Sequence, residues 1–246
     1  MLNGERILFI RCVFFLKILL LDLHLNYSNN MISLTEENYL KAIFHLIDGE
    51  SKVTINELSK VLNVKMPTVN NMMKKFAAKK WVIYESYKPL KITDSGKKEA
   101  ALVVRKHRLT EMFLVEKMNF GWENVHEIAE QVEHIKSDKF FDKMDEILNH
   151  PKFDPHGEPI PDKEGNIISL DLKKLSSCEV GEKVIFSTVT ITEDDFLSFL
   201  NEKNLELGKE LEIIEIQKYD KSMKVKMDDL ETILSKIVCE KILVKA

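Results

Sequence analysis

Histidine and glutamate residues recur at helical spacing in the middle of the chain. His126, Glu130, Glu133 and His134 stand at positions i, i+4, i+7 and i+8. Because successive residues of a helix are rotated by about 100°, these four side chains fall within an arc of roughly 100°. The spacing therefore predicts one helix face that carries two imidazoles and two carboxylates.

A second pair, His107 and Glu111, repeats the i, i+4 spacing upstream. Imidazole nitrogens and carboxylate oxygens together suit divalent cations such as Mn²⁺ and Fe²⁺. Each of these residues alone would favour a charged, solvated helix face. The repeated His-x-x-x-Glu spacing and the apolar companions Ile128, Ala129 and Val132 favour a metal site built from two adjacent helices.

The residues before these helices follow the order of a winged helix-turn-helix. Apolar residues recur at one-face helical spacing over 34–47, and Thr54 and Glu57 form a capping box before a short helix. Pro67 is compatible with the first turn of a further helix over 66–80, and two short strands follow at 81–84 and 89–92. In helix-turn-helix proteins the second helix of the pair, here 66–80, enters the major groove of DNA.

Charge is unevenly distributed along the chain. The whole chain has a net charge of −4, which provides no general attraction to nucleic acid. Residues 51–100 nevertheless contain eleven lysines and four acidic residues, a local charge of +7. The alternative is a solvated lysine-rich surface, but the overlap with the helix-turn-helix pattern favours contact with phosphates.

The rest of the chain predicts a helical middle and a β-rich end. Helices are expected over 94–118, 123–135 and 137–149, and residues 110–150 carry a net charge of −6. A Pro/Gly-rich connection over 151–165 leads to β-like runs at 183–186, 210–216, 223–227 and 242–244 around a helical segment at 193–205. We therefore predict a mainly α fold with small β parts that ends in a small β-barrel.

Cysteine usage and the first thirty residues bear on the compartment. The three cysteines are scattered and odd in number, which predicts a reducing compartment. Residues 7–25 are nearly all apolar but include Arg11, Lys17 and Asp22, and no small-residue cleavage site follows. We favour an over-extended start, with the working protein beginning at Met31, over a signal peptide or membrane anchor.

Several of these motifs resemble one known family. The segments RKHRLTE (105–111), VH (125–126), EH (133–134) and SD (137–138) are similar to metal-dependent repressors typified by the diphtheria toxin repressor and the manganese transport regulator, and DPHGEPIP (154–161) matches the linker of that family. The resemblance extends over about residues 34–246. It implies a winged helix-turn-helix DNA-binding domain (31–100), a helical metal-binding and dimerisation domain with its linker (101–168), and an SH3-like domain similar to ferrous-transport accessory domains (169–246), after the apolar leader (1–30).

The resemblance further implies two metal sites per subunit. The regulatory site would use Glu130, Glu133 and His134, with Asn38 at a first-helix position where relatives have Met or Asp. The ancillary site would use His107, Glu111 and His126, with Glu193 as a candidate from the C-terminal domain. Glu193 has a plain surface position as its alternative, because an accompanying ligand of the family falls on Phe196. An all-oxygen-and-nitrogen ligand set favours Mn²⁺, with Fe²⁺ as the alternative.

The resemblance also implies which residues contact DNA. The base-facing candidates on the recognition helix are Lys65, Pro67, Thr68, Asn70 and Asn71. Asparagine can pair with adenine edges, and threonine can contact a thymine methyl group. Lys74, Lys75 and Lys88 are expected to hold phosphates, and Tyr84 and Tyr87 to pack within the wing.

Together these features predict a cytoplasmic, metal-dependent transcriptional repressor that binds a palindromic double-stranded DNA operator as a homodimer. Metal would fix the first helix to the fifth and thereby favour DNA binding. The dimer interface is expected on 123–149, with apolar residues Phe140, Phe141, Met144, Ile147 and Leu148. Neither a membrane nor a small organic substrate is expected as a partner.

Two alternatives remain open at this point. The chain could be a winged-helix regulator that binds DNA constitutively and holds a structural metal. It could instead be a metal-dependent hydrolase, although it has no His-Glu-x-x-His motif.

Overall fold

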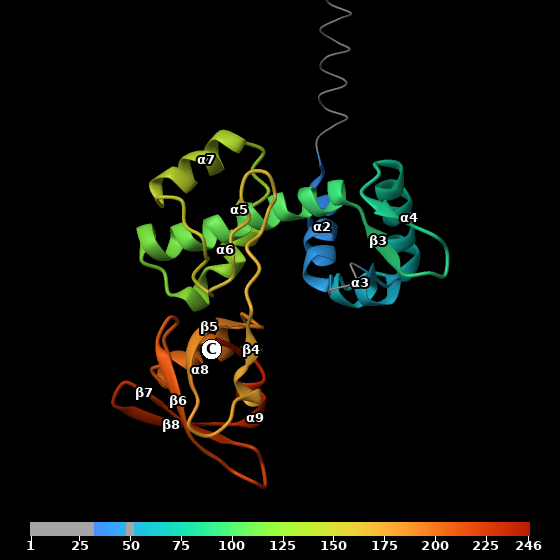
Figure 1. Ribbon diagram of the computed structural model, residues 1–246. Coiled ribbons are helices and arrows are strands. Elements are labelled where there is room, and N and C mark those ends of the chain that lie inside the picture. The colour runs from blue at the N-terminus through green and yellow to red at the C-terminus, as the bar shows by residue number, and fades with distance from the viewer. Residues whose placement is uncertain (1–31, 48–51) are drawn as a thin grey trace, which may run out of the picture. The chain divides into compact units, whose positions relative to one another are not determined.

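The computed structural model describes residues 32–47 and 52–246 (Figure 1). Its first elements are α2 (Leu34–Leu46), β1 (Lys52–Val53), α3 (Ile55–Val61), α4 (Met66–Ala78), β2 (Val82–Ile83) and β3 (Leu90–Ile92). The three strands pair antiparallel in the order β1-β3-β2. This arrangement confirms the predicted winged helix-turn-helix. Strand β1 was not predicted, because two residues carry no recognisable periodicity.

Local signals in the sequence define the helix-turn-helix. The Thr54 hydroxyl accepts a hydrogen bond from the Glu57 backbone N–H (3.2 Å), and the Glu57 carboxylate accepts one from the Thr54 backbone N–H (2.8 Å). This reciprocal capping box satisfies two backbone donors at the start of α3. Pro67 occupies the first turn of α4, where a missing N–H does no harm.

The recognition helix α4 is held by its apolar face. Val69, Met73 and Phe76 are fully buried, and the ring of Phe76 packs edge-on against Tyr39 and Trp81. Burying a side chain of this size stabilises the fold by roughly 1.5–3 kcal/mol. The opposite, polar face of α4 is left exposed to solvent.

The long helix predicted over 94–118 is confirmed as α5 (Asp94–Met118). Its N-cap is Thr93, whose hydroxyl accepts from the Gly96 backbone N–H (3.1 Å), and its C-cap is Asn119, which has the left-handed conformation (φ 57°). Gly96 lies against the wing: an added Cβ would stand 2.1 Å from the Trp81 carbonyl oxygen. A glycine is therefore required for α5 to approach the wing this closely.

Two shorter helices follow, after the single turn η1 (Trp122–Asn124): α6 (His126–Val132) and α7 (Asp138–Ile147). The predicted helix over 123–135 was too long, because α6 has Glu133 as its C-cap and His134 lies in the turn beyond. Ser137 caps α7 by accepting from the Phe140 backbone N–H (3.3 Å).

The core of this helical region changes one expectation. Phe141, Met144 and Leu148 are buried against Leu109 of α5 and Ile160 of the following segment. These three residues were expected at a dimer interface, but they are needed to pack α7 within its own subunit. Phe140 and Ile147, which border this buried face of α7, remain exposed.

The predicted Pro/Gly-rich connection is tied to α5 by two buried arginines. Arg105 donates to the Pro161 carbonyl oxygen (2.7 Å), and Arg108 donates to the Pro159 carbonyl oxygen (2.6 Å). Because a guanidinium offers five donors in a fixed plane, it can hold an irregular backbone in one conformation. The connection is therefore an ordered part of the helical region.

The C-terminal region contains β4 (Lys173–Lys174), η2 (Leu175–Ser177), β5 (Lys183–Val189), α8 (Asp194–Glu202), β6 (Glu210–Ile216), β7 (Met223–Met227), β8 (Leu230–Leu234), α9 (Lys236–Cys239) and β9 (Ile242–Lys245). The strands form an antiparallel sheet in the order β4-β9-β5-β6-β7-β8. The pairing register shifts once in β5 and once in β6, as it does at a β-bulge. This is the predicted SH3-like domain with one substantial helix; β4, β8 and α9 were not predicted.

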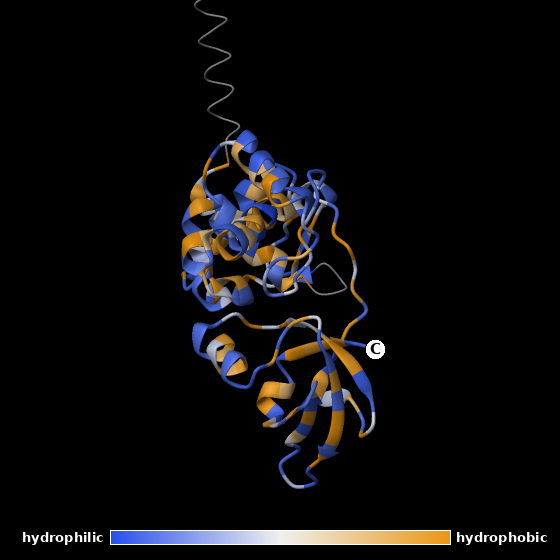
Figure 2. Cartoon of the chain, turned by 90° about the vertical axis from the view of Figure 1, so that its left-hand side faces the viewer, coloured by the Kyte–Doolittle hydropathy of each residue, from blue (hydrophilic) through white to orange (hydrophobic). Residues whose placement is uncertain are grey.

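Hydrophobic and hydrophilic residues alternate along the strands of this region (Figure 2). Strand β7 alternates buried and half-buried residues, and Leu211, Ile213 and Val225 from paired strands meet in one core with Leu197 and Leu200 of α8. The period of two along the strands supplies one buried face of the sheet.

Among the described residues, no helix combines the length and the apolar character needed to cross a bilayer. The apolar segment 7–25 and the proposed start at Met31 lie outside the described residues.

Candidate metal centre and recognition helix

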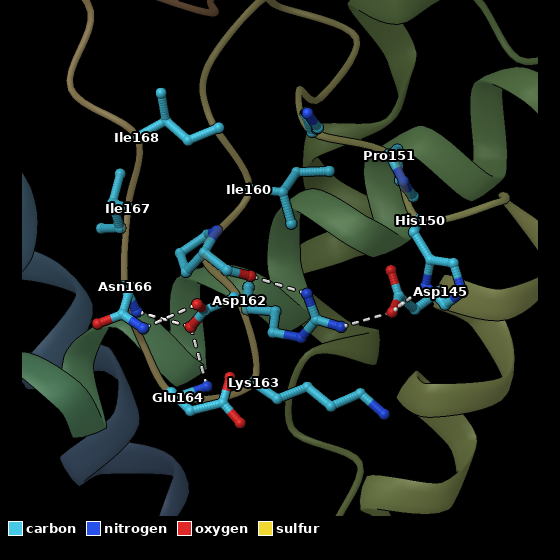
Figure 3. Close-up of a pocket in the computed structure, with 13 residues that line it drawn as sticks. Asp145, His150, Pro151, Ile160, Asp162, Lys163, Glu164, Asn166, Ile167 and Ile168 are labelled. Atoms are coloured by element: carbon cyan, nitrogen blue, oxygen red, sulfur yellow. Dashed lines mark hydrogen bonds and ion pairs between the residues drawn. The ribbon is translucent and has the colours of Figure 1, made fainter.

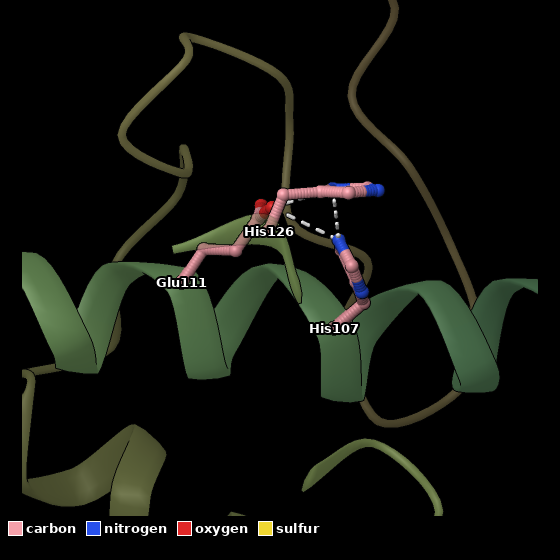
Figure 4. A group of neighbouring side chains, drawn as sticks. All are labelled: His107, Glu111 and His126. Atoms are coloured by element: carbon pink, nitrogen blue, oxygen red, sulfur yellow. Dashed lines mark hydrogen bonds and ion pairs between the residues drawn. The ribbon is translucent and has the colours of Figure 1, made fainter. Parts of the chain in front are cut away.

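Helix α5 supplies the first two candidate ligands. His107 and Glu111 are four residues apart, are both buried, and project from the same face of α5 (Figure 4). Their side chains meet, with 2.9 Å between His107 Nε2 and Glu111 Oε1. His126, the first residue of α6, lies beside them: its Nδ1 is 3.2 Å from His107 Nε2 and 3.3 Å from Glu111 Oε1. The structure thus brings the three predicted ancillary ligands together.

Two carboxylates from the end of α6 continue this cluster. Glu133 is completely buried, and its Oε2 lies 2.5 Å from His107 Nδ1. Glu130 is half-buried, with its Oε1 3.4 Å from His126 Nε2. His107 therefore contacts residues from both of the metal sites that the family resemblance implies.

One lysine lies between the two carboxylates. Lys41, on α2, places Nζ 2.5 Å from Glu130 Oε1 and 2.8 and 3.0 Å from the two oxygens of Glu133. Sequence reasoning did not identify Lys41, because 89 residues separate it from Glu130 and no local pattern links them. Its contacts join α2 to the end of α6.

Three other predicted ligands are placed differently. His134 is half-buried, with Nε2 3.8 Å from Glu133 Oε1, and falls outside the groups whose ligand atoms converge within 4.8 Å in the described chain. Glu193, the N-cap of α8, is exposed and belongs to none of those groups either. The Asn38 side-chain oxygen is buried and has no hydrogen-bond partner among the described residues. Roles for all three as ligands remain predictions.

Sequence reasoning missed a further acidic and imidazole group. Asp154 and His156 are buried in the connection and converge with Glu111, from which His156 Nδ1 is 3.6 Å distant. His156 also hydrogen-bonds through Nε2 with the Trp122 carbonyl oxygen (2.8 Å). The DPHG motif contains both residues, so their types were a usable signal, but a connection without periodicity does not predict where its side chains point.

The pKa values of His107, Glu111 and Asp154 are all shifted from their ordinary values. Burial disfavours the charged form of His107, yet hydrogen bonds with Glu111 and Glu133 outweigh it and raise the pKa of His107 to about 9. Burial also disfavours the Glu111 carboxylate, but hydrogen bonds from His107, His126 and His156 lower its pKa well below the ordinary value. Burial, together with the nearby Glu111 charge, raises the pKa of Asp154 to about 7. Perturbed values of this kind are typical of functional sites.

The residues present fit a divalent cation of intermediate hardness. Among the described residues, ligand atoms converge within 4.8 Å of one another in three groups: His107, Glu111 and His126; His107, Glu130 and Glu133; and Glu111, Asp154 and His156. All the donors are imidazole nitrogens or carboxylate oxygens, which suit Mn²⁺ and Fe²⁺. The two cysteines in the described residues, Cys178 and Cys239, are buried in the C-terminal region, so the cluster has no thiolate.

A separate pocket of about 470 Å³ lies along the connection (Figure 3). Its lining includes Arg105, Asp145 and His150 but none of the predicted metal ligands. Arg105 pairs with Asp145 (2.9 Å), which also contacts His150 (2.9 Å). We assign these contacts to anchoring of the connection.

The predicted DNA-contacting residues lie on one accessible surface of α4 and on the wing. Lys65, Pro67, Thr68, Asn71, Lys74, Lys75 and Lys88 are exposed, and Asn70 is half-buried. The Tyr84 hydroxyl donates to the Asn70 side-chain oxygen (2.9 Å), so Tyr84 joins the wing to α4. Tyr87 is fully exposed at the wing tip, and the expectation that it packs was wrong. Tyr87 has a positive φ (65°), which is typical of a tight turn, and its side chain is left exposed to solvent.

Comparisons with protein families match most of the chain. Residues 31–90 match the family described as "Iron dependent repressor, N-terminal DNA binding domain", and residues 93–162 match "Iron dependent repressor, metal binding and dimerisation domain". Residues 173–246 match the FeoA domain. The first two are domains of iron-dependent repressors, in agreement with the prediction of a repressor rather than an enzyme.

Individual proteins agree with the family models. The iron-dependent repressor IdeR of Mycobacterium tuberculosis is 31% identical over 127 residues, 52% of this chain, and the match spans only 55% of that protein. A manganese-dependent transcriptional repressor solved in complex with manganese has a TM-score of 0.77 and 27% identity, covering 85% of this chain and 99% of that one. ScaR with bound Zn²⁺ has a TM-score of 0.69 and 32% identity, covering 85% and 98%.

Fold, ligand cluster and comparisons agree, and the chain belongs to the iron-dependent repressor family that includes the diphtheria toxin repressor, IdeR and MntR, with a FeoA-like domain at its C-terminal end.

Proposed function

We propose that this protein is a cytoplasmic transcriptional repressor that binds a palindromic DNA operator as a homodimer when a divalent cation occupies the His107-centred cluster. One observation carries the proposal. Carboxylates at the end of α6 face Lys41 on α2, so the ligand cluster lies where the winged helix-turn-helix meets the metal-binding helices. Occupancy of the cluster can therefore influence how α2, and with it α4, is held.

The ligand residues would have distinct tasks. Glu130, Glu133 and His107 would hold the cation at the α2-facing side, with His134 and Asn38 as further regulatory ligands. His107, Glu111 and His126 would form the ancillary side, to which Asp154 and His156 add donors. A bound divalent cation supplies positive charge that neutralises the carboxylates and cross-links the elements that carry them. Fixing these elements lowers the conformational cost of DNA binding, so that cation and DNA affinities rise together.

Manganese is the proposed physiological cation, with Fe²⁺ as the alternative. Glu130 supplies a hard carboxylate to the cluster, and no cysteine of the described residues approaches it. Carboxylate and imidazole without thiolate favour Mn²⁺ over softer ions, although Fe²⁺ accepts the same donors. The relatives with solved structures include one described as manganese-dependent and one solved with Zn²⁺, which is consistent with a site that accepts several ions in vitro.

Fluorescence anisotropy of labelled DNA tests the proposal. Fragments from upstream of the protein's own gene and of metal-transport genes are titrated with protein in EDTA and then in Mn²⁺, anaerobic Fe²⁺ or Zn²⁺. We expect tight binding in the presence of metal and at least about tenfold weaker binding in EDTA, which corresponds to about 1.4 kcal/mol of coupling.

Two variants separate the cluster from general effects of charge. Glu133→Gln removes one ligand charge and should abolish the response to metal. Glu127→Gln makes the same chemical change at an exposed position of α6 outside the ligand groups, and should respond like the unaltered protein. Equal, tight binding in EDTA and in Mn²⁺ would show instead a constitutive DNA-binding protein with a structural metal.

A further inference from the structure

The Lys41 ammonium contacts the same carboxylate oxygens that would coordinate a cation. Its ammonium lies 2.5–3.0 Å from Glu130 Oε1, Glu133 Oε1 and Glu133 Oε2, three of the four oxygens of these carboxylates. The Lys41 side chain is only 12% exposed and that of Glu133 is fully buried, so solvent screens this ion pair weakly. Weak screening strengthens the attraction between the two charges, and removing either partner would leave the other charge buried without compensation.

The Lys41 ammonium cannot coordinate a metal ion at this position, and its charge disfavours binding of one. Lysine in its charged form has three donors and no acceptor, so it cannot be a ligand. Two positive charges a few ångströms apart also repel each other, most strongly where burial lowers the effective dielectric constant. A divalent cation bound by Glu130 and Glu133 must therefore displace Lys41 from their oxygens.

The lysine has the opposite effect on the protein without metal. Glu133 is completely buried, and an unpaired buried carboxylate destabilises a fold strongly. Lys41 supplies two of the contacts to that carboxylate, and His107 supplies another. The same side chain thus stabilises the metal-free fold and raises the free energy needed to fill the site.

We propose that Lys41 is an internal competitor for the divalent cation, whose ammonium holds Glu130 and Glu133 in the metal-free protein and sets the cation concentration at which the site fills. The inference rests on the proposed function, because it takes these carboxylates as metal ligands. It adds a residue of the DNA-binding domain, outside the ligand set, that controls the affinity of the site.

Direct measurement of Mn²⁺ binding tests the competition without using DNA. Free Mn²⁺ is followed by electron paramagnetic resonance during titration of the full chain and its variants. Lys41→Met keeps an unbranched side chain of similar length but removes the charge. We expect it to bind Mn²⁺ at least about tenfold more tightly at one site, equivalent to about 1.4 kcal/mol. Lys41→Arg keeps the charge and should stay within about threefold of the unaltered protein.

A matched control excludes a general effect of net charge. Lys143→Met also removes a lysine from a lysine–glutamate pair, with Glu146 on α7 (2.9 Å), and touches none of the ligand groups. Its Mn²⁺ affinity should equal that of the unaltered protein. Tighter binding in Lys143→Met of the same size as in Lys41→Met would overturn the proposal.

Thermal unfolding provides a second, independent readout. In EDTA, Lys41→Met should unfold at a lower temperature than the unaltered protein, because buried carboxylates lose their partner. In saturating Mn²⁺ the two midpoints should approach each other, so that the metal-induced rise is larger for the variant. Lys41→Gln, which keeps a hydrogen-bond donor, should show the same order with a smaller loss in EDTA.

The possible failures can be told apart. If the unaltered protein binds no Mn²⁺, the proposed function fails, and this inference with it. If it binds Mn²⁺ but Lys41→Met and Lys41→Gln, both folded, bind with equal or weaker affinity, the proposed function stands and Lys41 is a structural or positioning residue.

Discussion

At the scale of single residues, His107 contacts carboxylates of both proposed metal sites. Its two ring nitrogens contact different carboxylates, Nε2 with Glu111 and Nδ1 with Glu133. The pKa of about 9 means that the imidazole is charged at neutral pH in the metal-free protein and balances those carboxylates. Binding of a metal by His107 would require the neutral ring, so metal uptake releases a proton.

The raised pKa of His107 predicts a pH-dependent stability in EDTA. A histidine whose pKa is raised by folding contributes stability fully below its unfolded pKa of 6.5, and this contribution is lost as pH rises through about 9. The free energy of unfolding of the unaltered protein, minus that of His107→Gln, should fall by on the order of 3 kcal/mol between about pH 6 and pH 9.5. Urea unfolding of both proteins across this range measures it, and a difference independent of pH would contradict the assignment.

At the scale of elements, the recognition helix α4 has one buried apolar face and one exposed polar face that is available to DNA. One face of α4 buries Val69, Met73 and Phe76, and this leaves Asn71 and Lys74 exposed on the other side. Asn70 is engaged by Tyr84 through its side-chain oxygen. Because Asn70 is half-buried and its oxygen already accepts from Tyr84, the exposed Asn71 is the better candidate for paired hydrogen bonds to adenine.

Two substitutions on α4 should therefore differ in kind. Asn71→Ala is expected to cost about 1–3 kcal/mol on the cognate operator and to relax preference at one base pair, whereas Lys74→Ala should weaken binding to all sequences and reduce the salt slope by about 1. Anisotropy titrations on operator variants over a range of salt concentrations distinguish the two. Uniform weakening by Asn71→Ala would show that it contacts only the backbone of DNA.

The junction between the wing and α5 depends on Gly96. A methyl group there would collide with the Trp81 carbonyl oxygen at 2.1 Å, and neither backbone can move without disturbing the other. We expect Gly96→Ala to destabilise the protein by about 1–3 kcal/mol, as overpacking does. Lys97→Ala, at the exposed next position, should change stability by less than about 0.5 kcal/mol. Urea unfolding of the two variants checks this, and equal stabilities would contradict a tight junction.

At the scale of the whole molecule, α7 provides the surface that a second subunit could cover. Phe140 and Ile147 are 42% and 47% exposed, although both are large apolar residues, and they belong to the part of the chain that matches a dimerisation domain. Clustered exposed apolar side chains on one helix are typical of an interaction surface. Phe141, Met144 and Leu148 cannot contribute in the same way because they already form the core.

Substitutions on α7 should separate assembly from folding. Phe140→Ser combined with Ile147→Ser is expected to yield a folded monomer, because it alters exposed residues only. Phe141→Ser should instead destabilise the subunit by about 3 kcal/mol or more, since a buried aromatic ring is lost. Light scattering coupled to size exclusion reports the mass, and circular dichroism reports the fold. A double variant that remains dimeric would place the interface elsewhere.

Local patterns in the amino-acid sequence determine much of this protein by themselves. The capping box at Thr54 and Glu57, the helix 94–118 and the His107–Glu111 pair depend on neighbours within one or two turns, and each lies where the sequence predicts it. The positive charge of residues 51–100, the negative charge of residues 110–150 and the types of the candidate ligands can likewise be read from the sequence alone. They are sufficient to predict the fold class and a divalent-metal site.

Tertiary structure decided which of these groups meet. His107 contacts Glu133, Lys41 lies between Glu130 and Glu133, and His156 approaches Glu111, across separations that no helical period describes. Packing also determined that Phe141 lies in the core while its neighbour Phe140 is exposed. The physical reason is that sequence periodicity specifies a face of one element, whereas contacts between faces depend on how all the elements bury their apolar surface together.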